Sequence, residues 1–351
     1  MLAEKLLSWY SENGRHLPWR ETHNPYFIWL SEIILQQTRI QQGMSYYFHF
    51  IQQYPTVGDL AEASEEQVLK SWQGLGYYSR ARNMHAAAKY IAEDLKGEFP
   101  NTYKGILALK GVGPYTAAAI ASFAFCLPYP VIDGNVYRFV SRLYGIYTPI
   151  GTKQAYDEFE ERLTRLIDRE HPDNFNQAIM DFGSLYCKPT GCDCSNCIFA
   201  QECVAHNTDK VEYLPVRMEK TQPKERFFYY FDVRWQEDEE MMLVHRRDAG
   251  DIWQGLYELP LYEAEASIES SQLSGKISEL MEEWFGESPV GVEWVSSYQH
   301  QLTHRTIKAQ FFQVKMESTP MKMPQNLKAI PCSQLKILPI SRLIDRYLSR
   351  L

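Results

Sequence analysis

The 351-residue chain has no long apolar run, no excess of basic residues and no repeated or low-complexity segment. No stretch approaches the roughly 18 apolar residues that a membrane-spanning helix needs, so we expect no such helix. The first residues are mixed and charged, so we expect no signal peptide. These absences predict a protein without a membrane partner, in a reducing, cytoplasmic compartment.

The chain also lacks the positive charge that is typical of nucleic-acid-binding proteins. Its formal net charge is −8. Residues 1–210 contain 19 Lys and Arg against 23 Asp and Glu, and the remainder contains 17 against 21. Any binding to nucleic acid must therefore depend on local geometry, and it should weaken steeply as salt increases.

Length and composition predict two domains, each with its own core. Residues 1–206 are expected to form helix after helix, without a competing strand pattern. Residues 207–225 are polar and interrupted by prolines, which indicates a linker. Residues 226–351 should form an α+β domain. Its predicted strands lie within 226–235, 239–247 and 300–316, and its predicted helix within 266–286.

Several helix starts can be predicted from capping residues. Asn24 is a candidate N-cap with Pro25 at the first helical position, and Ser64 with Gln67 forms a capping box. Behind Asp133, apolar residues recur at helical spacing. These residues are Val136, Phe139, Val140 and Leu143.

Five of the seven cysteines fall between residues 187 and 203. Four of them, Cys187, Cys194, Cys197 and Cys203, are separated by six, two and five residues. Thiols this close in sequence favour a metal centre over free structural cysteines or disulfides. A zinc ribbon usually has two C-x-x-C pairs and this segment has one. An iron–sulfur cluster is therefore favoured over zinc, with Cys192 as a surplus thiol.

The segment LKGVGPYTAAAI, residues 109–120, places two glycines directly before a helix. Gly111 and Gly113 supply backbone conformations that only glycine reaches at low cost, and their N–H groups can approach an anion closely. The helix that follows adds its positive N-terminal end. Together, the N–H groups and the helix end would bind a DNA phosphate independently of the base sequence. A bare G-x-G is, however, more often an ordinary turn between helices.

Two carboxylates are candidates for acid–base chemistry. Glu32 lies among apolar residues at helical spacing, where loss of solvation would raise its pKa, as suits a general acid. Taken alone, a glutamate at the surface or at the edge of a pocket is the commoner explanation. Asp133 stands directly before a helix, where an N-cap role would also fix the orientation of a catalytic carboxylate.

Together, LKGVGPYTAAAI, the following VIDGNV and the cysteine spacing resemble the helix-hairpin-helix DNA glycosylases of the endonuclease III superfamily. WLSEIILQQTR and GLGYYSRARN narrow the resemblance to the adenine DNA glycosylase (MutY) family. It covers nearly the whole chain and is most specific in residues 15–205. It implies a multidomain protein: an all-α glycosylase domain with a helix-hairpin-helix at about 107–125 and an iron–sulfur loop at 187–203, then a Nudix-like α+β domain.

Members of this family flip adenine mispaired with 8-oxoguanine or guanine out of the duplex and hydrolyse its glycosidic bond. The resemblance implies that Glu32 protonates adenine, that Asp133 stabilises the sugar cation, and that Asn135 positions the catalytic groups and water. Other matched positions wedge into the DNA stack or line the adenine pocket. They are Gln37 and Tyr77 for the stack, and Arg20 and Gln177 for the pocket.

Tyr115 stands where bifunctional relatives carry a lysine that attacks the sugar and leads to strand cleavage. A phenol cannot form this Schiff base. The resemblance therefore implies a monofunctional glycosylase that leaves an abasic site in an intact strand, with Tyr115 lining the pocket and supporting the carboxylates.

In the C-terminal half, GDIWQGLYELP and the strands around it resemble a Nudix-like domain. Nudix hydrolases hold Mg²⁺ on an R-E-x-x-E-E-x-G helix. Here Glu282 and Glu283 are present but the R-E pair is missing, so lesion recognition is expected in place of hydrolysis. Leu302, Thr303 and His304 match the loop that contacts 8-oxoguanine, although Leu302 replaces a frequent aromatic residue. On pattern alone, this segment is a strand with two surface histidines.

The resemblance implies double-stranded DNA as the partner and a structural [4Fe-4S] cluster on the four cysteines as the cofactor. A monovalent cation at the helix-hairpin-helix and a sliding clamp are additional candidates, and we expect a monomer at the nucleoid. Three alternatives remain. Tyr115 opposes a bifunctional glycosylase for oxidised pyrimidines, the incomplete motif opposes a Nudix pyrophosphohydrolase, and the intact Glu32 and Asp133 oppose an inactive mismatch-binding protein.

Overall fold

The computed structural model describes residues 2–218 and 222–350. The chain forms two compact units. The helical unit comprises Met1–Glu62 and Asn83–Glu219, and the sheet unit comprises Ala63–Arg82 and Lys220–Leu351.

The division differs from the predicted domains in one segment, because residues 63–82 group with the sheet unit. Their helical pattern gives no indication of which unit they pack against. The predicted linker, 207–225, contains residues 219–221, which lie outside the described residues, as do residues 1 and 351 at the ends of the predicted domains.

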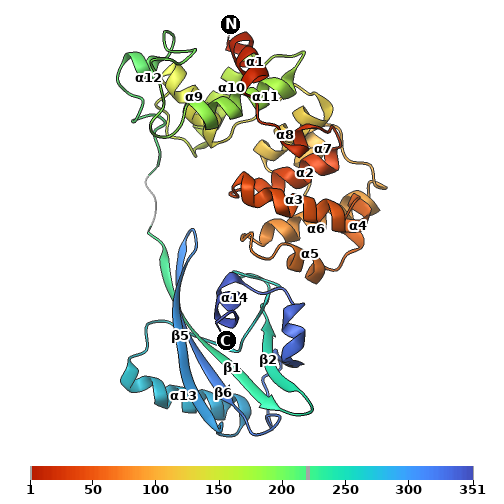
Figure 1. The fold of residues 1–351 in the computed structure, drawn as a ribbon, viewed down its shortest axis with the longest axis vertical. Helices are drawn as coiled ribbons and strands as arrows, with labels where there is room; N and C mark the ends of the chain where they lie inside the picture. The colour runs from red at the N-terminus through yellow and green to blue at the C-terminus, as the bar shows by residue number, and fades with distance from the viewer. Residues whose placement is uncertain (1, 219–221, 351) are drawn as a thin grey trace. The chain divides into compact units, whose positions relative to one another are not determined.

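The helical unit has no β-strand among its described residues, as the sequence predicts (Figure 1). None of its described helices, nor any in the sheet unit, is both long and apolar enough to cross a bilayer. Its elements are α1 (Leu2–Asn13), η1 (Pro18–Arg20), α2 (Pro25–Leu35), α3 (Ile40–Gln53), α4 (Val57–Glu62), most of α6 (Ser79–Glu93), α7 (Tyr103–Leu107), α8 (Pro114–Phe125), α9 (Gly134–Tyr144), α10 (Lys153–Leu166), α11 (Pro172–Asp181), the π-turn η2 (Phe182–Tyr186) and α12 (Val204–Asn207).

Capping residues set the helix starts near the cleft described below. The Asn24 side chain accepts a hydrogen bond from Tyr26 N (3.0 Å), and Asp133 caps α9 in the same way. The predicted apolar face of α9 is buried in a core that it shares with α10 and α11. The cap and the apolar spacing together place Asp133 at the edge of this core.

Helices α7 and α8 form the helix-hairpin-helix, which begins at Tyr103, earlier than predicted. Gly111 has a φ of 82°, and a Cβ there would lie 2.6 Å from Asn83 Cβ, so both conformation and space require glycine. Gly113 has a φ of −96°, which any residue adopts. The expectation that both glycines need a conformation special to glycine is therefore wrong for Gly113, where a Cβ would meet nothing within 4 Å.

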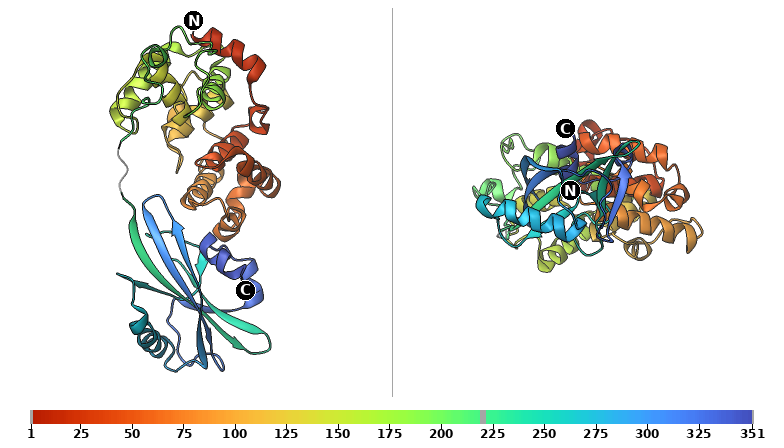
Figure 2. Two further views of the ribbon diagram at one scale, coloured as in Figure 1. Left: turned by 60° about the vertical axis from the view of Figure 1, so that its left-hand side comes forward. Right: turned by 90° about the horizontal axis from the view of Figure 1, so that it is seen from below.

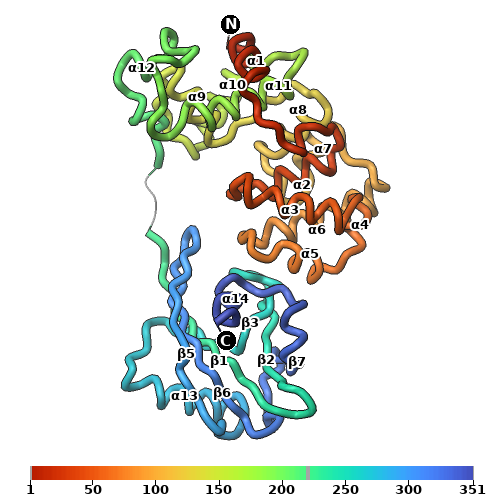
Figure 3. Tube along the Cα trace, in the orientation of Figure 1, coloured from red at the N-terminus to blue at the C-terminus, as the bar shows by residue number. Residues whose placement is uncertain are grey.

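In its described residues, the sheet unit is built on seven strands. Its elements are α5 (Glu65–Ser71), β1 (Lys224–Gln236), β2 (Glu240–Arg246), β3 (Tyr257–Glu258), β4 (Leu261–Ala264), α13 (Ser270–Phe285), β5 (Gly291–Gln301), β6 (Arg305–Lys315), β7 (Leu327–Pro331), η3 (Cys332–Lys336) and α14 (Arg342–Leu348). The main order is β3-β2-β1-β6-β5, and Figure 3 labels these five strands. In addition, β4 pairs with β1 and β7 pairs with β2. β1 and β6 run parallel, and the other pairs are antiparallel.

A helix covers each face of this sheet (Figure 2). Successive side chains of a strand point to opposite faces. Accordingly Phe228 and Tyr230 of β1 pack in a core with α14, whereas Tyr229 and Phe231 pack in a core with α13. The long aromatic run of β1 is explained by burial on both sides.

In this unit the predicted capping box is confirmed, whereas the strand predicted at 300–316 is not a single strand. The capping box of Ser64 and Gln67 is present at the start of α5. The strand predicted at 300–316 is instead the end of β5, a turn and β6. Leu302 N donates to Arg305 O (2.8 Å), which closes the turn and exposes Thr303 at its tip.

Candidate active site

The predicted catalytic residues line one cleft of about 600 Å³ in the helical unit. Helix α2 supplies Glu32, the start of α8 supplies Tyr115, and the start of α9 supplies Asn135, with Asp133 as its cap. These segments meet because α8 packs against both α2 and α11, and α9 packs against α11. The other predicted residues that line the cleft are Arg20, Gln37, Gly113 and Gln177.

Glu32 is 8 % exposed and lies within α2, where the neighbouring N–H groups are engaged in the helix. Burial raises the pKa of its carboxyl from 4.5 to about 7, while a hydrogen bond with Tyr115 and the charge of Arg20 act in the opposite direction. Burial also raises the pKa of Tyr115 well above 10, so the phenol remains neutral and donates to Glu32. A carboxyl with this pKa can hold a proton near neutral pH, as a general acid must.

Asp133 is held by three hydrogen bonds. Its Oδ1 accepts from the backbone N–H groups of Asn135 (2.9 Å) and Val136 (2.7 Å), and its Oδ2 accepts from the Asn135 side-chain amide (2.7 Å). Burial raises the pKa of Asp133 above its ordinary value of 3.8, and these donors oppose the rise without cancelling it. They stabilise the ionised form and fix the direction of the carboxylate, so capping and chemistry are compatible.

A buried acid behind the cleft was missed from the sequence. Asp181 is fully buried and pairs with Arg15 and with Arg20, whose Nη1 lies 2.8 Å from Asp181 Oδ2. The Tyr10 hydroxyl donates to Gln177 Oε1 (2.6 Å), and Arg20 lies against the Tyr10 ring. One network therefore orients Arg20 and Gln177. In the sequence, Asp181 is only a lone aspartate at the end of an amphipathic helix.

Arg138 was also missed, and it joins Asn135 to the cysteine loop. It is 6 % exposed, and its guanidinium donates to Asn135 Oδ1 (2.9 Å), to Cys187 O (2.8 Å) and to Gly183 O. One turn further along α9, Arg142 Nη1 lies 3.4 Å from Cys187 Sγ. The two arginines thus fix the start of the cysteine loop against α9.

The five loop cysteines line a cavity together with aromatic side chains. Among the described residues, no three cysteine sulfurs lie within 4.8 Å of one another, although those of Cys192 and Cys194 are 3.7 Å apart. Thiolates on one tetrahedral zinc ion would be about 3.8 Å apart.

A second group of predicted residues lines a hollow of about 650 Å³ in the sheet unit. These residues are Tyr77, Leu302, Thr303 and His304, and the Tyr77 hydroxyl lies 2.6 Å from Thr303 Oγ1. Leu302 packs against the core beneath α14, while Thr303 and His304 are exposed. The turn therefore exposes the polar groups of Thr303 and His304, while Leu302 holds it against the core.

The two residues predicted to wedge into DNA share an unusual backbone conformation. Gln37 has a φ of 56° and Tyr77 a φ of 47°, in the left-handed region that residues other than glycine rarely adopt. Both side chains are exposed. Strained positions of this kind concentrate at functional sites.

Both the helical part and the C-terminal part of the chain are similar to known proteins. Residues 30–167 match the HhH-GPD superfamily of base excision DNA repair proteins, and residues 231–350 match the NUDIX domain. An adenine DNA glycosylase of Buchnera aphidicola subsp. Baizongia pistaciae is 31% identical over 87% of this chain and 83% of its own. The human adenine DNA glycosylase is 38% identical over 60% of this chain and 40% of its own. A thermostable thymine-DNA glycosylase has a similar fold, with a TM-score of 0.55 and 26% identity over 59% of this chain and 95% of its own.

The helical fold, its hairpin and the cleft with two acidic groups define a DNA glycosylase of base excision repair. More narrowly, the chain belongs to the adenine DNA glycosylase family, with a Nudix-like C-terminal domain, and it excises adenine. The comparisons do not favour a pyrimidine glycosylase or a Nudix hydrolase.

Proposed function

We propose that this glycosylase removes adenine paired with 8-oxoguanine or guanine in double-stranded DNA and leaves the strand intact. The observation that carries the proposal is the pairing of a buried acid, Glu32, with a neutral phenol, Tyr115, in the same cleft as a capped carboxylate, Asp133. The similarity to adenine DNA glycosylases supports the choice of base.

Glu32 donates a proton to the flipped adenine, since burial keeps its carboxyl protonated near neutral pH. Protonation makes the base a better leaving group as the glycosidic bond breaks. Asp133, fixed by its cap bonds, stabilises the positive charge that develops on the sugar. Asn135 holds the second oxygen of Asp133 and keeps it from rotating.

The residues lining the cleft support a monofunctional reaction. No lysine is found among them in the described part of the chain. Cleavage of the strand through an imine requires an unprotonated amine next to the sugar. With Tyr115 in that place, water takes the position of the departing base and an abasic site remains.

The second hollow supports recognition of the base opposite adenine. Thr303 and His304 offer exposed hydrogen-bonding groups, and the bond between Tyr77 and Thr303 ties the wedge residue to this turn. A polar contact can discriminate 8-oxoguanine from guanine, because a hydrogen-bonding group that is buried against the wrong base without a partner raises the free energy of the complex.

The cysteine loop suits a [4Fe-4S] cluster on Cys187, Cys194, Cys197 and Cys203. The loop has a single C-x-x-C pair where a zinc ribbon usually has two, and its cysteines line one cavity with aromatic side chains. The cluster would supply structural support to the loop. Arg142 lies close enough to stabilise the Cys187 thiolate.

At the hairpin, the N-terminus of α8 suits a DNA phosphate, with a monovalent cation as a further ligand. We also propose that the protein acts as a monomer, with a sliding clamp as a candidate partner.

Duplexes with adenine opposite 8-oxoguanine, guanine or thymine test the function directly. Each is incubated with excess enzyme, with or without alkali afterwards. We expect breaks mainly after alkali, formed fastest opposite 8-oxoguanine. Strong cleavage without alkali, or an imine trapped by borohydride, would contradict the monofunctional reaction, and equal rates opposite thymine would contradict the mispair. Iron content and visible absorbance test the cluster separately.

A further inference from the structure

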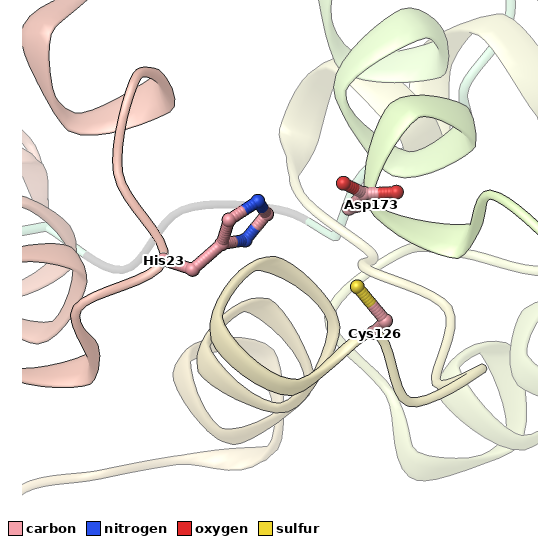
Figure 4. Close-up of side chains that lie close together, drawn as sticks. All are labelled: His23, Cys126 and Asp173. Atoms are coloured by element: carbon pink, nitrogen blue, oxygen red, sulfur yellow. The ribbon is translucent and has the colours of Figure 1, made fainter.

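A mixed set of three potential metal ligands lies in the helical unit and includes none of the loop cysteines. His23, Cys126 and Asp173 each present one ligand atom, and the three atoms lie within 4.8 Å of one another. Figure 4 shows their side chains grouped around a shared space. No other such group of three or more is found among the residues that the structure describes.

Each side chain is available to a metal ion. His23 Nδ1 lies 2.9 Å from Phe123 O, and donation of the ring N–H to this carbonyl leaves the Nε2 lone pair free, as is common in histidine ligands. Among the described residues, neither the Cys126 thiol nor the Asp173 carboxylate has a hydrogen-bond or ion-pair partner. His23 and Cys126 are exposed and Asp173 is half-buried, so an ion can enter from solvent.

We propose that His23, Cys126 and Asp173 bind a zinc ion, with water as the fourth ligand. A thiolate, an imidazole and a carboxylate are all zinc ligands, whereas Ca²⁺ and Mg²⁺ take oxygen. On a tetrahedral zinc ion, such atoms are separated by about 3.3–3.8 Å, so small side-chain rotations complete the site. Binding releases the proton of the Cys126 thiol to solvent.

The ion connects three helices that frame the cleft. His23 directly precedes the cap of α2, Cys126 is the C-cap of α8, and Asp173 lies in the first turn of α11. Two of these helices carry Glu32 and Tyr115. The bound ion therefore stabilises the frame of the cleft without contacting the reacting groups. Because the ligands are remote in sequence, no spacing motif indicates the site.

Zinc binding to the full-length protein tests the proposal. Wild type and the variants His23→Ala, Cys126→Ser and Asp173→Asn are dialysed against chelator-buffered Zn²⁺, and bound zinc and iron are counted by elemental analysis. Wild type should bind one zinc ion more than each variant, with affinity at this site lowered about 100-fold or more by each substitution. Cys332→Ser changes the other cysteine outside the loop and, as the matched control, should bind like wild type.

The difference between wild type and variant does not depend on what the cysteine loop binds, so the result is independent of the proposed function. Saturating zinc should raise the Tm of the wild type by about 5 °C more than that of Cys126→Ser. X-ray absorption at the zinc edge should show one sulfur and about three lighter ligands for this ion. Equal zinc content in wild type and all three variants, each shown to be folded by circular dichroism, overturns the proposal.

Discussion

Replacing Glu32 by glutamine separates the acidity of this side chain from its shape. The pKa of the buried carboxyl is about 7, against 4.5 for an ordinary glutamate. Between these pH values, the folded protein holds a proton that the unfolded chain has released. The free energy of unfolding therefore falls as pH rises through this window and levels off above it. At 1.36 kcal/mol per unit, the pKa difference corresponds to about 3 kcal/mol.

The Glu32→Gln variant carries no such proton. Its free energy of unfolding, relative to wild type, should rise by about 3 kcal/mol between pH 4 and pH 8. The new amide adds an offset that does not vary with pH, so only the change with pH tests the pKa. Urea unfolding of the full chain, followed by circular dichroism for the transition of the helical unit, gives this difference. Glu161→Gln, exposed on α10, is the matched control and should show no such trend.

The rate of adenine excision should also depend on the proton of Glu32. Loss of the general acid should lower the single-turnover rate by about 10²–10⁴-fold with DNA affinity retained. The wild-type rate should decline above pH 7 as Glu32 loses its proton. The reasoning is refuted if the variant excises adenine within tenfold of wild type, or if its relative stability does not change with pH.

Four further substitutions test other parts of the site. Tyr115→Lys should yield an imine that borohydride traps on adenine-containing duplexes, and no trapped product would show that this position does not face the sugar. Asp133→Asn retains a good N-cap, so urea unfolding should change by less than about 1 kcal/mol, while single-turnover excision should fall at least about 100-fold. Thr303→Val removes the bond to Tyr77 and should lower the 8-oxoguanine to guanine rate ratio by about tenfold, with Thr303→Ser as the control that keeps it. Arg138→Met leaves two buried carbonyl groups without this donor and should cost about 1–3 kcal/mol in urea unfolding; an unchanged midpoint would argue against its bridging role.

The parts of the fold that depend on short-range rules could be predicted from the sequence. Asn24 and Asp133 begin helices because a short polar side chain satisfies the free N–H groups of the first turn. Segments rich in aromatic and β-branched residues, with one helical segment between them, indicated the α+β unit. A tight turn at Gly111 could be predicted because glycine is the residue that adopts a positive φ at low cost, and the structure shows a φ of 82° there.

Contacts between remote parts of the chain could not be predicted in this way. Arg20 and Asp181 are 161 residues apart, and neither has a spacing that points to the other. Residues 63–82 have a clear helical pattern, yet Lys70 Nζ donates to Leu338 O (3.0 Å) in the sheet unit. Helical periodicity shows that one face is apolar, but it does not identify the segment that covers it.

The different roles of the two carboxylates follow from where each stands relative to its helix. Glu32 lies within α2, where the backbone N–H groups already bond to carbonyls of the same helix, so its charge is stabilised only by the neutral phenol of Tyr115 and the nearby charge of Arg20. Asp133 precedes α9, where the first N–H groups have no partner within the helix and turn to the carboxylate. Burial raises the pKa of both groups, but at Asp133 three hydrogen bonds to the carboxylate oppose this rise. Backbone position, more than residue type, therefore determines how many donors each carboxylate has to oppose the effect of burial.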